Sequence, residues 1–158
     1  MTVDFFSTLY AILDPARSPE IYPVLRRLHP DAECLFGRDI PQAVREVSPH
    51  LVAFPEDGAL ITWWRTQGLG KSWGIACRTA ADKATLRVHL KKFLRVYLPA
   101  GGLYLFRFWD PRVLTVFLSS AEASERADFF GPVEAFYAEE TGTGRTLTFR
   151  STDAREVP

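Results

Sequence analysis

The sequence predicts a single α/β domain, with a central, mainly parallel or mixed sheet flanked by helices and a C-terminal β-hairpin. Short apolar runs alternate with stretches of helical period between residues 10 and 110. The chain of 158 residues has about the length of one domain with one core. Two strand-like runs joined by a glycine turn close the chain. We therefore expect one domain over residues 1–151 and a frayed tail over residues 152–158.

The first half of the chain alternates predicted strands and helices. Strands are expected over residues 9–14, 32–36 and 51–54, where apolar residues cluster between turn signals. Ser18, followed by a proline and a glutamate, is typical of a helix start, and Pro30 ends that helix. A short helix is expected over residues 41–47.

The second half continues the pattern. A helix around residues 60–64 ends at a glycine turn, and a strand follows over residues 72–78. The best-determined helix runs over residues 80–97, because Thr79-x-x-Asp82 indicates a capping box and leucine and aromatic residues recur at helical spacing.

Residues 103–109 (LYLFRFW) predict a fifth strand of the sheet. Asp110-Pro111 then starts a helix, and a second helix is expected over residues 121–130. The predicted terminal hairpin pairs residues 133–140 with residues 145–151.

Charge and hydropathy exclude several classes of protein. Nineteen basic and nineteen acidic residues cancel, so nucleic acid is not an expected partner. No uncharged apolar run reaches the length of about 18 residues that a membrane span needs, and we expect a cytoplasmic protein without a signal peptide. Cys34 and Cys77 lie in apolar, strand-like runs and are expected to be buried thiols without a disulfide.

No motif for a cofactor, a metal or a nucleophile stands out. The segment 68–72 (GLGKS) ends like a phosphate-binding loop, but Arg65 occupies the position of the first glycine, and a helix precedes the segment. The three histidines have no metal-ligand spacing. His89 lies at the edge of an apolar stripe, which favours partial burial with a satisfied ring over catalysis. We expect no cofactor, no metal and no small-molecule substrate.

Two surface features are candidates for binding a partner. Four basic residues, Arg87, Lys91, Lys92 and Arg95, lie opposite the apolar stripe of the helix predicted over residues 80–97. A solvated face is the default interpretation, but such a patch in a neutral protein also suits an acidic partner. Trp63 and Trp64 are neighbours on one helix, so one indole is expected to reach the rim. If that ring lay beside the basic residues, the two features would form one binding surface.

Two aspartates end predicted strands, and each has an arginine close behind it. They occur in the segments 13–17 (LDPAR) and 109–112 (WDPR). Such carboxylates usually cap the backbone that follows, and an arginine can pair with them. Together with His89 they could instead form an acid–base cleft, so Asp14, Asp110 and His89 are the alternative catalytic set.

An ordered set of segments resembles the adaptor-chaperones of type VI secretion. The set comprises YAILDPAR, IYPVL, AECLF, SPHLVAF, SWGI, LRVHLKKFLRVYLP, FRFWDPRVL and FFGPV. The resemblance covers about residues 9–136 and implies an α/β lobe without catalytic activity. The hallmark positions that it marks are Asp14, Trp73, Gly74, Arg107, Asp110, Pro111 and Arg112.

The resemblance also implies what the protein binds. Adaptors of this kind bind an effector and help to load it onto the VgrG spike protein. Many of them continue into a second, helical lobe that this sequence lacks, so the α/β lobe is expected to grip its partner alone. A small enzyme and a generic interaction domain remain the alternatives.

Overall fold

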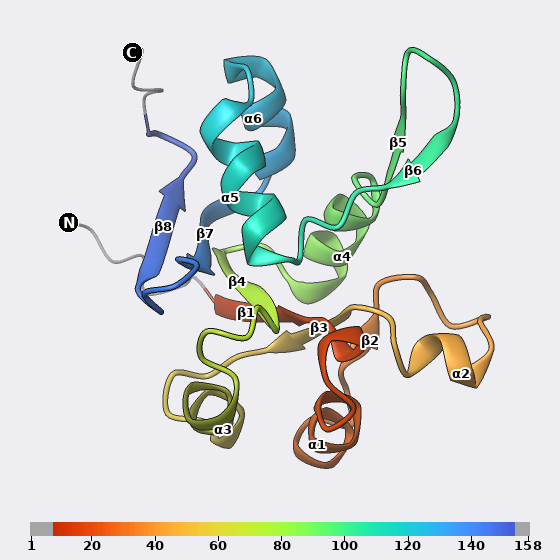
Figure 1. Ribbon diagram of the computed structural model, residues 1–158, viewed down its shortest axis with the longest axis vertical. Coiled ribbons are helices and arrows are strands. Elements are labelled where there is room, and N and C mark those ends of the chain that lie inside the picture. The colour runs from red at the N-terminus through yellow and green to blue at the C-terminus, as the bar shows by residue number, and fades with distance from the viewer. Residues whose placement is uncertain (1–7, 154–158) are drawn as a thin grey trace.

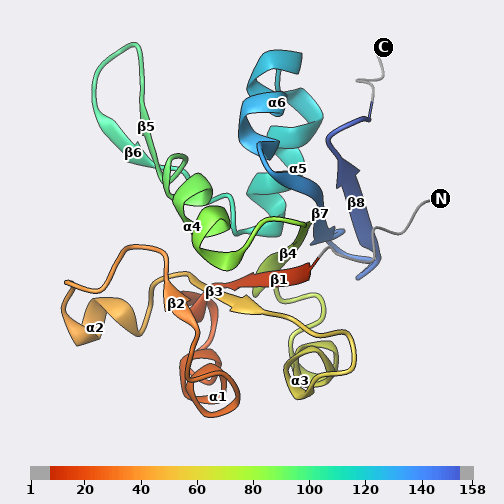
Figure 2. The same cartoon turned by 180° about the vertical axis from the view of Figure 1, so that it is seen from behind.

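The computed structural model describes residues 8–153, which form a six-stranded sheet between two layers of helices (Figure 1). The strands of the sheet are β1 (Thr8–Leu13), β2 (Glu33–Cys34), β3 (His50–Ala53), β4 (Gly74–Thr79), β7 (Val133–Glu139) and β8 (Thr146–Arg150). The longer helices are α1 (Ile21–Leu28), α3 (Ala59–Gln67), α4 (Lys83–Lys91), α5 (Pro111–Ser120) and α6 (Ala123–Phe130). Helices α1 and α3 cover one face, and the other three cover the opposite face (Figures 1 and 2). The predicted α/β class is confirmed.

The sheet is antiparallel, whereas a mainly parallel or mixed sheet was expected from the sequence. Its order is β2-β3-β1-β4-β7-β8, and each neighbouring pair is antiparallel. The antiparallel pairing arises because strands from successive strand–helix–strand units are interleaved in the sheet. Helix α1 leads from β1 to β2, but β3 lies between those two strands; α3 leads from β3 to β4, but β1 lies between them. Each strand–helix–strand unit therefore joins parallel strands that are separated by an antiparallel one.

Side chains along each strand point alternately to the two faces of the sheet, and each face is covered by its own hydrophobic core. Tyr10 and Ile12 of β1 pack against the layer of α4, α5 and α6, whereas Ala11 and Leu13 pack against α1 and α3. This follows from the two-residue period of a strand. The first core is rich in aromatic rings, and the ring of Phe129 lies 4.9–6.1 Å from five other phenylalanine rings.

The segment 92–109 differs from both of its predicted elements. Helix α4 ends at Lys91, and the chain then forms a separate hairpin of β5 (Arg95–Tyr97) and β6 (Leu103–Leu105). Gly101 and Gly102 have φ of 92° and 101°, the left-handed conformation that glycine adopts freely, and they turn the hairpin. After β6 the chain leaves the extended conformation and buries Phe108 and Trp109. The predicted fifth strand is therefore neither in the central sheet nor continuous.

The predicted terminal hairpin is confirmed and extends the main sheet, because β7 pairs with both β4 and β8. Two cap predictions differ in position. Helix α1 begins at Ile21, not beside Ser18, and α4 begins after Asp82, whose carboxylate accepts the backbone N–H of Thr85 at 2.7 Å. The short helical segments are η1 (Pro15–Arg17) and α2 (Gln42–Arg45).

Cys34 and Cys77 are both free and buried, and burial raises the pKa of the Cys77 thiol to about 12. Of the predicted tail, Asp153 accepts the backbone N–H of Arg150 at 2.8 Å, and residues 154–158 lie outside the described range, as do residues 1–7. Among residues 8–153, no helix is long and apolar enough to cross a membrane.

We expect Phe129→Ala to lower the free energy of unfolding by about 3–5 kcal/mol, because it leaves a cavity among five rings. Urea denaturation followed by tryptophan fluorescence measures the change. Val116→Ala is the matched control, since Val116 is 69% exposed on α5 and should change stability by no more than about 0.5 kcal/mol. Similar losses for the two variants would contradict a core centred on Phe129.

Candidate functional site

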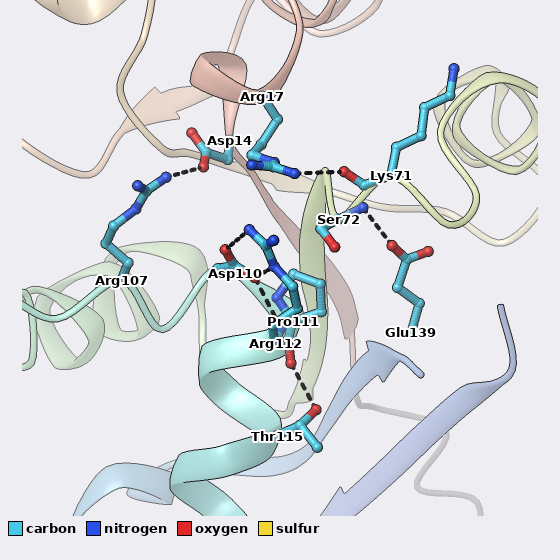
Figure 3. A network of polar contacts seen from close by, with 10 residues as sticks. All are labelled: Asp14, Arg17, Lys71, Ser72, Arg107, Asp110, Pro111, Arg112, Thr115 and Glu139. Carbon is cyan, nitrogen blue, oxygen red and sulfur yellow. Dashed lines mark hydrogen bonds and ion pairs between the residues drawn. The ribbon is translucent and has the colours of Figure 1, made fainter. Parts of the chain in front are cut away.

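Five charged residues gather where β1 ends and where the chain passes from β6 into α5 (Figure 3). This carboxylate–arginine cluster consists of Asp14, Arg17, Arg107, Asp110 and Arg112. It contains four of the hallmark positions expected from the sequence. The two carboxylates are buried, whereas the arginine side chains reach the surface.

Asp14 joins three segments of the chain. Its Oδ1 accepts the backbone N–H of Ala16 at 3.1 Å, which caps η1, and its Oδ2 accepts Arg107 Nη2 at 2.8 Å. Its own backbone N–H donates to the carbonyl of Trp73 at 2.7 Å, beside the start of β4. The Asp14 side chain is only 2% exposed, so the charge from Arg107 compensates a carboxylate that has lost its water.

Asp110 holds the start of α5. Its Oδ1 accepts the backbone N–H of Arg112 at 2.9 Å and Arg112 Nε at 3.0 Å, while its Oδ2 accepts Arg112 Nη2 at 2.7 Å. Pro111 follows the cap at the first helical position, where no N–H is required. Burial alone would raise the pKa of Asp110, but the hydrogen bonds and charge of Arg112, with a further contribution from Arg17, lower it. The same pairing raises the pKa of Arg112.

Arg17 connects the turn between α3 and β4 to this cluster, and Glu139 connects the same turn to the end of β7. Arg17 Nη2 lies 3.5 Å from the carbonyl of Lys71, and the Glu139 carboxylate accepts the backbone N–H groups of Gly70 and Ser72. Ser72 has φ of 57°, an uncommon conformation for a residue other than glycine. The backbone amides of the loop that resembles a phosphate site therefore already bind an acid, which agrees with the sequence-based rejection of a nucleotide site.

Trp73 and Gly74 are hallmark positions with a packing role. Trp73 is buried, and its ring lies 4.9 Å from that of Trp63. A Cβ atom on Gly74 would lie 2.2 Å from the carbonyl oxygen of Ile12. Only glycine allows β4 to approach β1 this closely, so Gly74 is required by the packing of the two strands.

The tryptophans and the basic residues do not form the single surface considered from the sequence. Trp63 and Trp64 lie on α3, on the opposite face of the sheet from α4 (Figures 1 and 2). The four basic residues do not share one helix, because Arg87 and Lys91 lie on α4, Lys92 follows it, and Arg95 begins β5. Both indoles are partly buried, against Trp73 and Phe54 respectively. The physical reason is that α3 and α4 flank β4 in sequence and cross to different sides. Partner binding by either half of that set stays a prediction.

The alternative catalytic set is not assembled. His89 is buried more completely than the partial burial expected, and its Nε2 lies 2.7 Å from the carbonyl of Phe129. Asp14 and Asp110 bind arginines instead of His89. No group of three metal-ligating side chains occurs among residues 8–153.

Sequence reasoning missed one pairing and one residue of the site. Asp14 pairs with Arg107, 93 positions away, and not with the nearby Arg17. Glu139 reaches the 70–72 turn from the end of β7, and no local signal marks it. Both pairings depend on the strand order, which local patterns do not determine.

The comparisons with known proteins give a family but no described activity. The family model described as "Domain of unknown function (DUF4123)" matches residues 9–128, from β1 into α6. The match spans more than half of the sequence, and the chain belongs to this family. No curated protein and no solved structure matches it.

We expect Asp110→Asn to destabilise the protein near neutral pH and to have less effect in acid. Asparagine can still cap α5, so the variant removes mainly the charge pairing with Arg112. The pKa of Asp110 is lower in the folded protein than the ordinary value of about 3.9. Its stabilisation is therefore present above about pH 4 and is lost as pH falls through the folded pKa. Urea denaturation of both proteins between pH 7 and pH 3 measures the difference, and a constant difference would contradict the assignment.

We expect Arg107→Ala to lower the free energy of unfolding by about 1.5–3 kcal/mol, because it leaves the Asp14 carboxylate buried without its charged partner. Asp14→Asn and the double variant complete a thermodynamic cycle. The double variant should be less destabilised than the sum of the single variants. Additive losses would show that the two side chains do not interact energetically.

Proposed function

We propose that this member of the DUF4123 family is a non-enzymatic adaptor that binds a type VI secretion effector and helps to load it onto the VgrG spike protein. The ordered segments that resemble such adaptors overlap the residues 9–128 matched by the family model. On this proposal the chain works in the cytoplasm, before the effector is exported.

The observation that carries the proposal is the commitment of both buried carboxylates to arginine. A general acid or base must exchange a proton with a substrate, and it needs open access to do so. Asp14 and Asp110 instead hold η1, the β6–α5 connection and the start of α5 in fixed positions. The hallmark motif is thus used to shape a surface, which is what a binding protein requires.

The arginines of the cluster are suited to contact a partner. The side chains of Arg107 and Arg112 are 46% and 48% exposed, and Arg17 is exposed beside them. Each guanidinium has five N–H donors, and the aspartates use only some of them. Because the buried acids fix the orientation of Arg107 and Arg112, the remaining donors of these two side chains are available to carboxylates or carbonyls of a protein partner.

The test is capture and secretion in the native cell. We expect the tagged chain to co-purify with one effector and with VgrG, and deletion of the chain to abolish secretion of that effector while other effectors are still secreted. A plasmid copy of the parent chain should restore secretion. Capture of neither protein, or normal secretion of every effector after deletion, would contradict the adaptor proposal. Capture of unrelated proteins alone would favour the generic interaction domain.

A further inference from the structure

The β5–β6 hairpin projects from the body of the protein (Figures 1 and 2). It carries a concentration of exposed apolar side chains. We call residues 95–105 the arm. Six of the eleven large hydrophobic residues that are exposed in the described chain lie here: Val96, Tyr97, Leu98, Leu103, Tyr104 and Leu105. Tyr97 is 79% exposed and Tyr104 55%. Apolar surface gathered in this way usually marks an interaction site.

Both faces of the arm are apolar and uncovered. The register pairs Val96 with Tyr104 on one face, and places Tyr97, Leu103 and Leu105 on the other. None of these side chains packs into either core of the described structure. An isolated two-stranded hairpin is at best marginally stable in water. A partner that covers one face would therefore also stabilise the arm.

The arm has two open edges. Strands β5 and β6 pair only with each other in the described sheet topology. Backbone hydrogen bonds join Leu98 to Gly102 and Phe106 to Leu94. By the alternation of an antiparallel ladder, the N–H and C=O groups of Arg95 and Tyr97 point outward along one edge, and those of Leu103 and Leu105 along the other. An extended segment can add to either edge as a third strand.

The arm and the helix before it are positively charged. Residues 83–109 include six lysines and arginines and no acidic residue, although the whole chain is neutral. Lys83 and Arg87 are paired with acids on or near β2. Lys91, Lys92 and Arg95 are exposed and have no ion pair among residues 8–153. The foot of the arm therefore attracts negative charge.

We propose that the arm docks an extended acidic segment of a partner protein, in which apolar residues alternate with aspartate or glutamate, as a third strand. The proposal rests on the proposed function for the identity of that partner as the effector. A second copy of the chain is disfavoured because two arms would bring like charges together. A membrane is disfavoured because the open backbone edges would lose their hydrogen bonds in hydrocarbon.

The experiment uses the whole chain and two synthetic peptides. One twelve-residue probe alternates valine and isoleucine with glutamate, and the matched probe has lysine in place of each glutamate. We expect the acidic probe to bind, measured by fluorescence anisotropy, and to bind more weakly as salt increases. The lysine probe should not bind. Hydrogen exchange should slow at Arg95 and Tyr97, or at Leu103 and Leu105, when the acidic probe is bound.

Variants locate the binding. We expect Tyr97→Ser with Tyr104→Ser to weaken binding about tenfold or more, because exposed aromatic anchors dominate such contacts. Charge reversal of Lys91 and Lys92 to glutamate should slow association about tenfold and remove most of its salt dependence. Val116→Ser is the matched control, since it removes an equally exposed apolar side chain from α5. Melting temperatures confirm that each variant folds.

Several outcomes would overturn the proposal. They are equal binding of the two probes, parent-like binding by the double tyrosine variant, arm-dependent dimerisation, or arm-dependent sedimentation with phosphatidylglycerol vesicles without binding of the acidic probe. Capture experiments with the effector distinguish a failure of the arm proposal from a failure of the adaptor proposal. If the parent and the double tyrosine variant both capture it, the arm is not the site and the adaptor function stands. If the arm binds the acidic probe but no effector is captured, the adaptor function fails and the arm proposal stands.

Discussion

The hydrogen bond from Arg107 to the buried carboxylate of Asp14 is the contact on which the arrangement of this protein most depends. It joins the end of β1, near the centre of the sheet, to the segment that leaves the arm. The backbone of Asp14 is bonded to Trp73 at the start of β4, so one residue fixes three parts of the chain. A carboxylate buried this deeply requires a charged partner, and that requirement determines where the β6–α5 connection must run.

The two layers of the fold have different roles around this contact. On the α1 and α3 side of the sheet, Trp73 packs against Trp63 just before β4. On the other side, Phe108 and Trp109 follow Arg107 directly into the aromatic core. The motif FRFWDPR thus alternates groups that enter the core with groups that pair at the surface. These contacts form a base from which the arm and the side chains of three arginines extend into solvent.

Local patterns predicted the strands and most helices to within a few residues, because apolar periodicity and caps act over short distances. They failed at residues 92–105, where Phe93, Leu94 and Tyr97 continue the helical spacing of α4 but the glycine turn allows a hairpin instead. They also failed for the sheet, since interleaved strands leave no local trace. The hallmark residues were identified, but the partner of Asp14 was not: Arg17 is near in sequence, and Arg107 is near in space.

The central claim is that the Asp14–Arg107 contact holds the arm in place, and a distance measurement tests it most directly. Spin labels at positions 67 and 100 report the distance from α3 to the arm tip by pulsed electron resonance, and the buried thiols of Cys34 and Cys77 are shielded from labelling. We expect the distance distribution of the parent to be narrower than that of Arg107→Ala. An equally narrow and unshifted distribution in Arg107→Ala would contradict the claim.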